Sequence, residues 1–248
     1  MTCIRPMPMV VAALFLLAIS HQTQAKSPQT HTGAMVLAIS WQPAFCERAK
    51  RRPECRSQRK GRFDTHHFSL HGLWPQPASR SYCGVSESVV ETDKRRRWRD
   101  LPALGLSREM QRALWQMMPG AQSFLHRHEW IKHGTCYSDS PERYFHDSVA
   151  LLEAINASSV RDLFADNIGR RLTNAQIRNA FDEAFGRGAG LRVRVSCRRD
   201  GRREIIDEIT IGLSGVIGDE PSMTRLIAAS RPTKRGCPAG IVDPVGYQ

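Results

Sequence analysis

Six cysteines distributed between residues 46 and 237 constrain the fold of this 248-residue chain more than any other feature. An even number of cysteines in an exported chain indicates disulfide bonds, and three bonds would tie together distant segments. Fifteen pairings of six cysteines are possible, and nearness in sequence favours only Cys46–Cys55. The C-x-x-C spacing of cysteine-based metal sites is absent. The six are Cys46, Cys55, Cys83, Cys136, Cys197 and Cys237, and a seventh, Cys3, lies near the N-terminus.

The first 25 residues have the features of a secretory signal peptide. Arg5 is their only charged residue, the run Met9–Ile19 is almost entirely apolar, and Thr23 and Ala25 are small residues at the spacing of a cleavage site. The apolar run is too short to span a bilayer as an anchor. We therefore expect cleavage after Ala25 and a mature protein, residues 26–248, that is periplasmic or secreted and has no membrane segment.

The chain is strongly basic, with 36 Lys and Arg against 24 Asp and Glu and a formal net charge of +12. Loss of Arg5 with the signal peptide would leave +11. A charge of this size favours a polyanionic partner such as nucleic acid. Basic residues cluster at 48–52, at 94–97 beside Trp98, and at 198–203. We interpret each cluster as a solvated loop rather than a dedicated binding groove.

Hydrophobic periodicity predicts a single α+β domain in which helices pack on an antiparallel β-sheet. No internal repeat or long linker divides the chain, and a hydrophobic content of 41% can supply a core. Ser107 and Thr173 are expected to cap helices, and Gly134 is expected to end one. The expected strands are Ala34–Trp41, Thr65–Leu70, Leu191–Ser196 and Glu204–Leu213, and the expected helices are Ser107–Met118, Gln122–His133, Glu142–Ile155, Ser159–Ala165 and Asn174–Phe185.

The stretch HEWIKHGTC, residues 128–136, looks like a zinc-protease helix but has the wrong spacing. That signature places two histidines four residues apart. His128 and His133 are five apart, about 140° around a helix, so they cannot reach one ion from the same regular helix. Glu129 and His133 are four apart and share a face. The stretch therefore predicts a carboxylate beside an imidazole, a pair of groups suited to general acid–base catalysis. We expect no metal or other cofactor.

A second stretch, FSLHGLWPQ at residues 68–76, places a histidine at the end of an expected strand. Here Gly72, Trp74 and Pro75 are expected to turn the chain sharply after His71. Taken alone, such a histidine is more often structural than catalytic, and such a tryptophan is more often part of the core than a platform for a ligand. The presence of both stretches in one chain favours a functional interpretation.

Together the two stretches resemble the two active-site segments of the ribonuclease T2 family, whose members are exported, metal-independent, RNA-cleaving enzymes with an α+β fold. The resemblance covers essentially the whole mature chain. It implies an endoribonuclease that cleaves single-stranded RNA through a 2′,3′-cyclic phosphate to 3′-phosphate products with low base specificity. It also implies the disulfides Cys83–Cys136 and Cys197–Cys237 beside Cys46–Cys55.

The resemblance assigns catalytic roles by position. His71 and His133 match the two proton-transferring histidines, with His133 the expected base and His71 the expected acid of the first step. Glu129 matches the catalytic carboxylate. His128 and Lys132 match residues that hold the phosphate and stabilise its charged transition state. The chemistry agrees, because RNA supplies its own 2′-hydroxyl nucleophile and needs only proton carriers with a pKa near neutral pH, as imidazole has.

The resemblance also implies a base-binding site. Trp74 and Tyr82 match aromatic residues that stack on a base. Some family members have an Asp two residues after the Trp, where this chain has Gln76, so a base preference cannot be copied from those members. His126 does not match the pattern, and we expect it to be a surface histidine.

Two other functions are considered. A non-catalytic nucleic-acid-binding protein on the same fold would be recognised by loss of His71 or His133, and both are present. A metal-dependent phosphoesterase would need clustered Asp, Glu and His ligands, and the chain has no Asp-rich motif. We therefore expect a monomeric enzyme that acts on single-stranded RNA, with DNA as a weak competitive binder.

Overall fold

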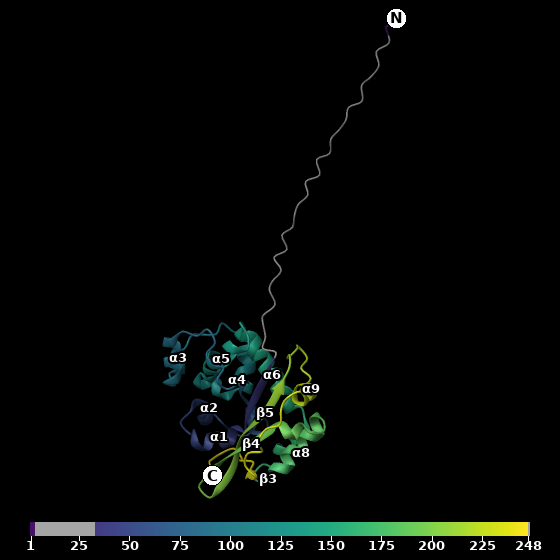
Figure 1. Cartoon of the computed structure of the whole chain (residues 1–248). Coiled ribbons are helices and arrows are strands. Elements are labelled where there is room, and N and C mark those ends of the chain that lie inside the picture. Colours follow the sequence, from purple (N-terminus) through teal and green to yellow (C-terminus); the bar gives the residue numbers. More distant parts are fainter. Residues whose placement is uncertain (3–32, 248) are drawn as a thin grey trace.

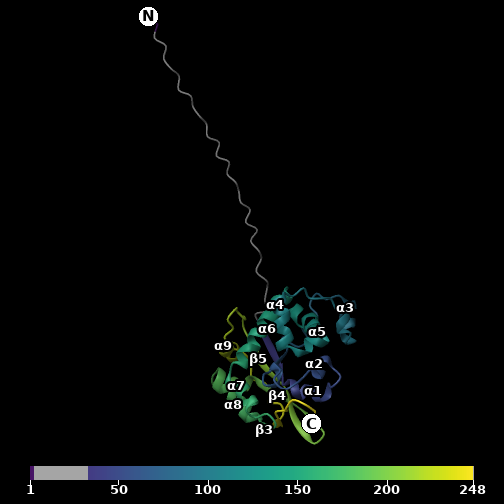
Figure 2. The ribbon, with the colours of Figure 1, turned by 180° about the vertical axis from the view of Figure 1, so that it is seen from behind.

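The computed structural model describes residues 1–2 and 33–247, so all but the first two residues of the predicted signal peptide lie outside the described residues. In this part of the chain, helices pack on a six-stranded sheet, which confirms the expected α+β class (Figure 1). Figures 1 and 2, seen from opposite sides, place α3, α4 and α5 on one side of the central strands and α8 and α9 on the other. None of the described helices has the length and apolar character needed to cross a membrane.

The sheet is built around one long central strand, β5. The strand order is β2–β1–β5–β6–β3, and β4 also pairs with β5. The antiparallel pairing that we predicted holds for every strand pair except β5 and β6, which run parallel where Ile205 lies opposite Ile241. A long connection that contains α9 separates these two strands, so no hairpin turn forces them to be antiparallel. The strands are β1 (Ala34–Ser40), β2 (Ser69–Pro75), β3 (Arg171–Thr173), β4 (Val193–Asp200), β5 (Arg203–Ser214) and β6 (Ala239–Ile241).

The strand predicted at Thr65–Leu70 is wrong in position. Residues 63–65 form a 3₁₀ turn, and β2 begins at Ser69 because it pairs with β1 from Ser40 to Met35. The pairing is irregular in its middle, since Ala38 lies opposite Gly72 and Ile39 opposite Leu70. His71 is therefore the extra residue of a β-bulge, and it lies within the strand rather than after it. Bulges redirect side chains and are frequent beside active sites.

The helices begin and end close to the predicted residues where a capping signal exists. Ser107 caps α4 by accepting a hydrogen bond from Met110 N at 3.1 Å, and Thr173 caps α8 with a capping box. The predicted helix 122–133 is shorter, because residues 119–123 form a 3₁₀ turn and Phe124 is left-handed. The helices are α1 (Gln42–Arg48), α2 (Pro53–Arg56), α3 (Glu87–Lys94), α4 (Arg108–Met117), α5 (Leu125–Lys132), α6 (Pro141–Asn156), α7 (Ser159–Ala165), α8 (Asn174–Phe185) and α9 (Met223–Ala228).

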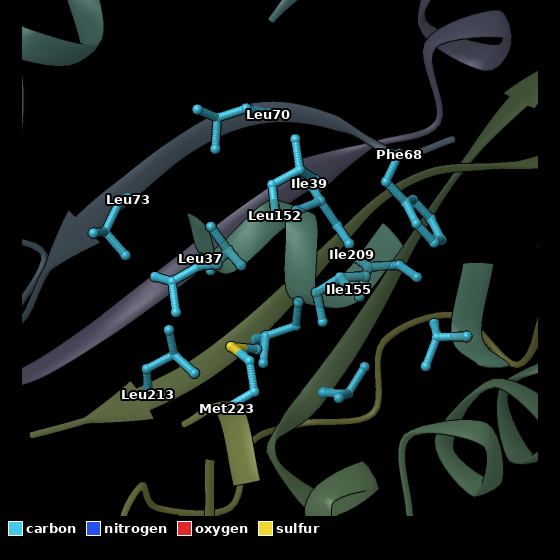
Figure 3. Packing of buried hydrophobic residues seen from close by; sticks show 14 of the residues in the cluster. Leu37, Ile39, Phe68, Leu70, Leu73, Leu152, Ile155, Ile209, Leu213 and Met223 are labelled. Atoms are coloured by element: carbon cyan, nitrogen blue, oxygen red, sulfur yellow. The ribbon is translucent and has the colours of Figure 1, made fainter. Parts of the chain in front are cut away.

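One hydrophobic core lies between the sheet and α6, and it fixes the strand that carries His71. Leu70 and Leu73 of β2 point inward and meet Leu37 and Ile39 of β1 and Leu152 of α6 (Figure 3). Both leucines can face the core although they are three residues apart, because the bulge at residue 71 restores the inward direction. Residues 71 and 74 are correspondingly left half-buried on the other face.

Three disulfides join these elements, and they are the pairs that the family resemblance implied. Cys46–Cys55 joins α1 to α2. Cys83–Cys136 joins the loop after β2 to the turn after α5. Cys197–Cys237 joins β4 to the segment before β6.

Candidate active site

The fold brings together the side chains of the two sequence motifs. His71 comes from the bulge of β2, Glu129 lies in α5, and His133 is the residue that ends that helix. The bond between Cys83 and Cys136 links the segments that follow the two motifs. This covalent link restrains the segments that carry His71 and Glu129 relative to each other, which favours a preorganised site.

Glu129 is the central group of the site. Its side chain is only 1% exposed, and its Oε2 accepts a hydrogen bond from the indole Nε1 of Trp74 at 2.9 Å. Its Oε1 lies 3.7 Å from Nε2 of His71 and 3.8 Å from Nε2 of His128. The negative charge of Glu129 raises the pKa of His71. The arrangement therefore favours positive charge at His71, where an anionic substrate could bind.

Gly72 provides the space for this carboxylate. A Cβ atom at Gly72 would lie 2.0 Å from Oε2 of Glu129 and 2.7 Å from Nε1 of Trp74. Only glycine permits an approach this close. Position 72 of the motif is thus a glycine because the carboxylate of Glu129 occupies the space that a side chain would need. The sharp turn that we predicted at residues 72–75 is wrong, because β2 continues to Pro75.

His71 has a second carboxylate partner, which comes from β5. Its Nδ1 lies 2.5 Å from Oε2 of Glu208. An ionised carboxylate can only accept, so Nδ1 carries the proton and donates, and Nε2 faces Glu129. Burial by itself lowers the pKa of His71, but the hydrogen bond to Glu208 and the charges of Glu129 and Asp207 raise it above its ordinary value. These partners therefore favour the protonated imidazole of His71.

His128 is oriented in the same way by Asp93 of α3. Its Nδ1 lies 2.7 Å and 2.9 Å from the two oxygens of Asp93, whose side chain is buried. The hydroxyl of Tyr82 donates to the same carboxylate at 2.8 Å. The ring of His128 stacks on Trp98, with 4.7 Å between the centroids and 21° between the planes. These contacts leave Nε2 directed toward Glu129.

His133 has the opposite electrostatic environment from His71. Burial, with the positive charges of Lys132, His128 and His71, lowers the pKa of His133 to about 3. Its ring lies 5.6 Å from Trp74, which in turn is 5.2 Å from His71. The two histidines therefore lie against one tryptophan, and their environments shift their pKa values in opposite directions.

A cavity of about 700 Å³ opens beside these residues. Four of the predicted site residues line it: His71, Tyr82, His128 and Lys132. Its wall also includes residues of α1 and α2 and acidic residues of β5. Within residues 33–247 no three His, Cys, Asp or Glu side chains are grouped as metal ligands.

Trp74 and Gln76 lie beside the catalytic residues and do not line the cavity. Trp74 is half-buried, donates to Glu129 and packs against His71 and His133. The side-chain amide of Gln76 donates to the backbone oxygen of Trp74 at 3.2 Å. The contacts of Gln76 thus keep the strand end in place.

The expectation that His126 is a surface residue is wrong. It is half-buried beside a second cavity of about 290 Å³, which Leu104, Trp115 and Phe124 also line. Burial, together with the charge of Arg127, lowers the pKa of His126 to about 4. Residues 126 and 128 are two apart in α5, about 200° around the helix, so their side chains leave it in nearly opposite directions.

Sequence reasoning missed three residues that orient the site: Asp93, Trp98 and Glu208. Nothing in the local sequence of Asp93 or Trp98 identifies a partner. Glu208 carried a weak signal, because it interrupts an apolar strand together with Asp207. Its partner His71 is 137 residues away, and only the pairing of β5 with β1 brings the two together.

The fold and the site together define a class of protein. A disulfide-bonded α+β domain that presents His71, His128 and Lys132 at one cavity, with Glu129 buried beside them, can carry out acid–base chemistry on an anionic substrate. The chain belongs to the ribonuclease T2 family, because the model of that family matches residues 32–225.

Individual relatives agree with this membership. The chain is 30% identical to Ribonuclease I of Escherichia coli (strain K12) over 242 residues, which cover 86% of each protein. It is 29% identical over 163 residues to a probable ribonuclease of Haemophilus influenzae, covering 63% of this chain and 55% of that one. The structure of ribonuclease MC1 from bitter gourd seeds matches with a TM-score of 0.56 and 18% identity, over 84% of this chain and 99% of that one, and so shares the fold.

Proposed function

We propose that this chain is an endoribonuclease that cleaves single-stranded RNA by attack of the substrate's own 2′-hydroxyl. The observation that carries the proposal is the pair His71 and His133, which lie against one tryptophan with pKa values shifted in opposite directions. A reaction that needs one acid and one base at once requires such a pair. Membership of the ribonuclease T2 family supports the same function.

In the first step of the proposed reaction, neutral His133 takes the proton from the 2′-hydroxyl. The 2′-oxygen attacks phosphorus, the bond from phosphorus to the 5′-oxygen breaks, and protonated His71 gives the proton on Nε2 to that leaving oxygen. The products are a 2′,3′-cyclic phosphate and a free 5′-hydroxyl. The raised pKa of His71 and the lowered pKa of His133 support this assignment of acid and base.

In the second step the roles are exchanged. His71 takes a proton from water, the water oxygen attacks the phosphorus of the cyclic phosphate, the bond from phosphorus to the 2′-oxygen breaks, and His133 gives its proton to that 2′-oxygen. The product is a 3′-phosphate, and both histidines recover their starting states. Lys132 and His128 stabilise the negative charge that develops on the phosphate oxygens, and Glu129, whose Oε1 lies 3.7 Å from Nε2 of His71 and 3.8 Å from Nε2 of His128, helps to orient both rings.

The base-binding roles rest on the family resemblance. Tyr82 lines the cavity, and its hydroxyl is fixed by Asp93, so its ring is held in a position to stack on a base. Trp74 would contribute the exposed part of its ring while its indole N–H holds Glu129. Gln76 acts through its bond to the backbone of Trp74. Stacking on aromatic rings tolerates every base, which supports low base specificity.

The proposal includes the setting in which the enzyme works. Residues 1–25 are the signal peptide, and residues 26–248 are the catalytic domain of a monomer that is periplasmic or secreted. The three disulfides support an oxidising compartment. DNA lacks the 2′-hydroxyl and should therefore act only as a weak competitive inhibitor, attracted by the basic charge.

One digestion tests the reaction. An oligoribonucleotide and its analogue with a single 2′-deoxy position are incubated with the enzyme in excess EDTA, and the product ends are identified by mass. We expect cleavage at every site except the deoxy position, with the cyclic phosphate appearing before the 3′-phosphate. Cleavage at the deoxy position, or loss of activity in EDTA, would overturn the mechanism.

A further inference from the structure

Two of the three basic clusters do not behave as separate solvated loops. The cavity that His71 lines is also lined by Arg48 of α1 and by Arg52, which precedes α2. Two further cationic residues line it: Lys94, the last residue of α3, and Arg96 just beyond that helix. The clusters are more than 40 residues apart in sequence. The fold thus gathers four cationic side chains beside the catalytic residues, and this corrects the interpretation that we made from the sequence.

The arginines stand on a rigid support. Arg48 ends α1 and Arg52 precedes α2, and the disulfide between Cys46 and Cys55 joins these two helices. The buried carboxylate of Glu54 in α2 accepts a hydrogen bond from Ser123, which ties the support to the turn before α5. Side chains on a fixed support lose less freedom on binding, so a ligand can use their charge at lower entropic cost.

Trp98 connects the support to the catalytic site. The guanidinium of Arg52 lies 5.5 Å from the ring centroid of Trp98, and the imidazole of His128 stacks on the same ring with 4.7 Å between centroids. His128 is a proposed ligand of the scissile phosphate. Arg52 and His128 are therefore both in contact with one indole ring.

The guanidinium charges of these arginines are only partly compensated within the protein. Arg52 lies 5.5 Å from the ring centroid of Trp98, and Arg48 lies 5.2 Å from that of Phe45. Arg48 also interacts electrostatically with Asp207 and stabilises the ionised form of that carboxyl group. The other acidic residues of the cavity have partners elsewhere. Glu208 is bonded to His71, Asp93 to His128 and Tyr82, and Glu54 to Ser123. Asp207, with which Arg48 interacts, also lies 3.7 Å from Arg198.

We propose that Arg48 and Arg52 form a binding site for backbone phosphates of single-stranded RNA that flank the cleaved linkage. The site recognises the negative charge of the backbone and does not distinguish base sequence, because contacts to phosphate oxygens carry no information about the bases. Its consequence is a preference for long substrates over dinucleotides. The inference rests on the proposed ribonuclease function. It adds a preference for long substrates, which the catalytic residues alone would not produce.

The test uses substrates with one cleavable linkage. A dinucleotide with one ribose is compared with a decamer that has one ribose at its centre and deoxyribose elsewhere. We expect wild-type enzyme to have a higher kcat/KM for the decamer. The double variant R48Q/R52Q should lose about tenfold on the decamer at low salt and keep the dinucleotide rate. For the decamer, the slope of log kcat/KM against log salt concentration should become shallower by about 1.4 in this variant, about 0.7 for each lost phosphate contact.

The matched control is R56Q/R59Q, which removes the same charge from exposed positions near Cys55 that do not line the cavity. It should keep the preference for the decamer. The inference is overturned if wild-type enzyme shows no such preference, if R48Q/R52Q retains it, if the control loses it equally, or if R48Q/R52Q loses the same factor on the dinucleotide. If wild-type enzyme cleaves neither substrate, the proposed function fails instead.

Discussion

At the scale of single residues, the bond between His71 and Glu208 makes the clearest prediction. The acid of the first step must be protonated, so the high-pH limb of activity follows the pKa of His71, which Glu208 raises. Glu208→Gln removes a negative charge 2.5 Å from Nδ1 and should move this limb to lower pH by about one unit. The pH profile of kcat/KM on a dinucleotide measures the shift. Glu204→Gln, the same change farther along β5, should leave the limb in place, and an unmoved limb in Glu208→Gln would remove Glu208 from the mechanism.

The histidines themselves provide a second prediction at this scale. His71→Ala and His133→Ala each remove one proton carrier, so each should lower kcat by about 10²- to 10⁴-fold while the protein stays folded. His126→Ala is the control, and its activity should remain near that of the wild type because residue 126 lies at the second cavity. Near-normal turnover in either of the first two variants would refute the acid–base pair.

At the scale of elements, strand β2 and helix α5 must approach closely for the site to form. Gly72→Ala would place a methyl group 2.0 Å from Oε2 of Glu129, so Glu129 or β2 must move. A displacement of about 1 Å can cost 10²-fold in rate, and we expect a loss of about that size. Gly218→Ala is the control, since its Cβ would meet no atom within 4 Å. Equal activities of the two variants would contradict the close approach.

The same elements show what the sequence could and could not predict. The motif histidines, Glu129 and the helix caps at Ser107 and Thr173 follow from local patterns, and the family resemblance extended these to the disulfide pairs. The bulge at His71 could not be predicted, because it depends on which residues of β1 pair with β2. Glu208 was missed for a similar reason, since hydrogen bonding between strands determines its neighbours.

At the scale of the whole molecule, the expected export can be checked on the purified protein. Cleavage after Ala25 predicts a mature chain that begins at Lys26. All six cysteines of that chain are in disulfides, so it should contain no free thiol. Intact mass and thiol titration of the native protein measure both properties. A retained apolar leader, or two or more reactive thiols, would contradict export to an oxidising compartment.

The free energy of unfolding of the whole molecule should also decrease in acid, and the lowered pKa of His126 is one identifiable cause. Its folded pKa is about 4, against about 6.5 in an unfolded chain. Between these values the unfolded state binds more protons, so the free energy of unfolding decreases as pH falls. His126→Leu should therefore reduce the difference in this free energy between pH 7 and pH 4 by about 1–3 kcal/mol. Denaturant unfolding at both pH values measures it. The control is Gln111→Leu, a change in the same cavity that removes no titrating group, and it should alter the free energy of unfolding equally at both pH values. If His126→Leu and the wild type show the same pH dependence, protonation of His126 does not affect folding.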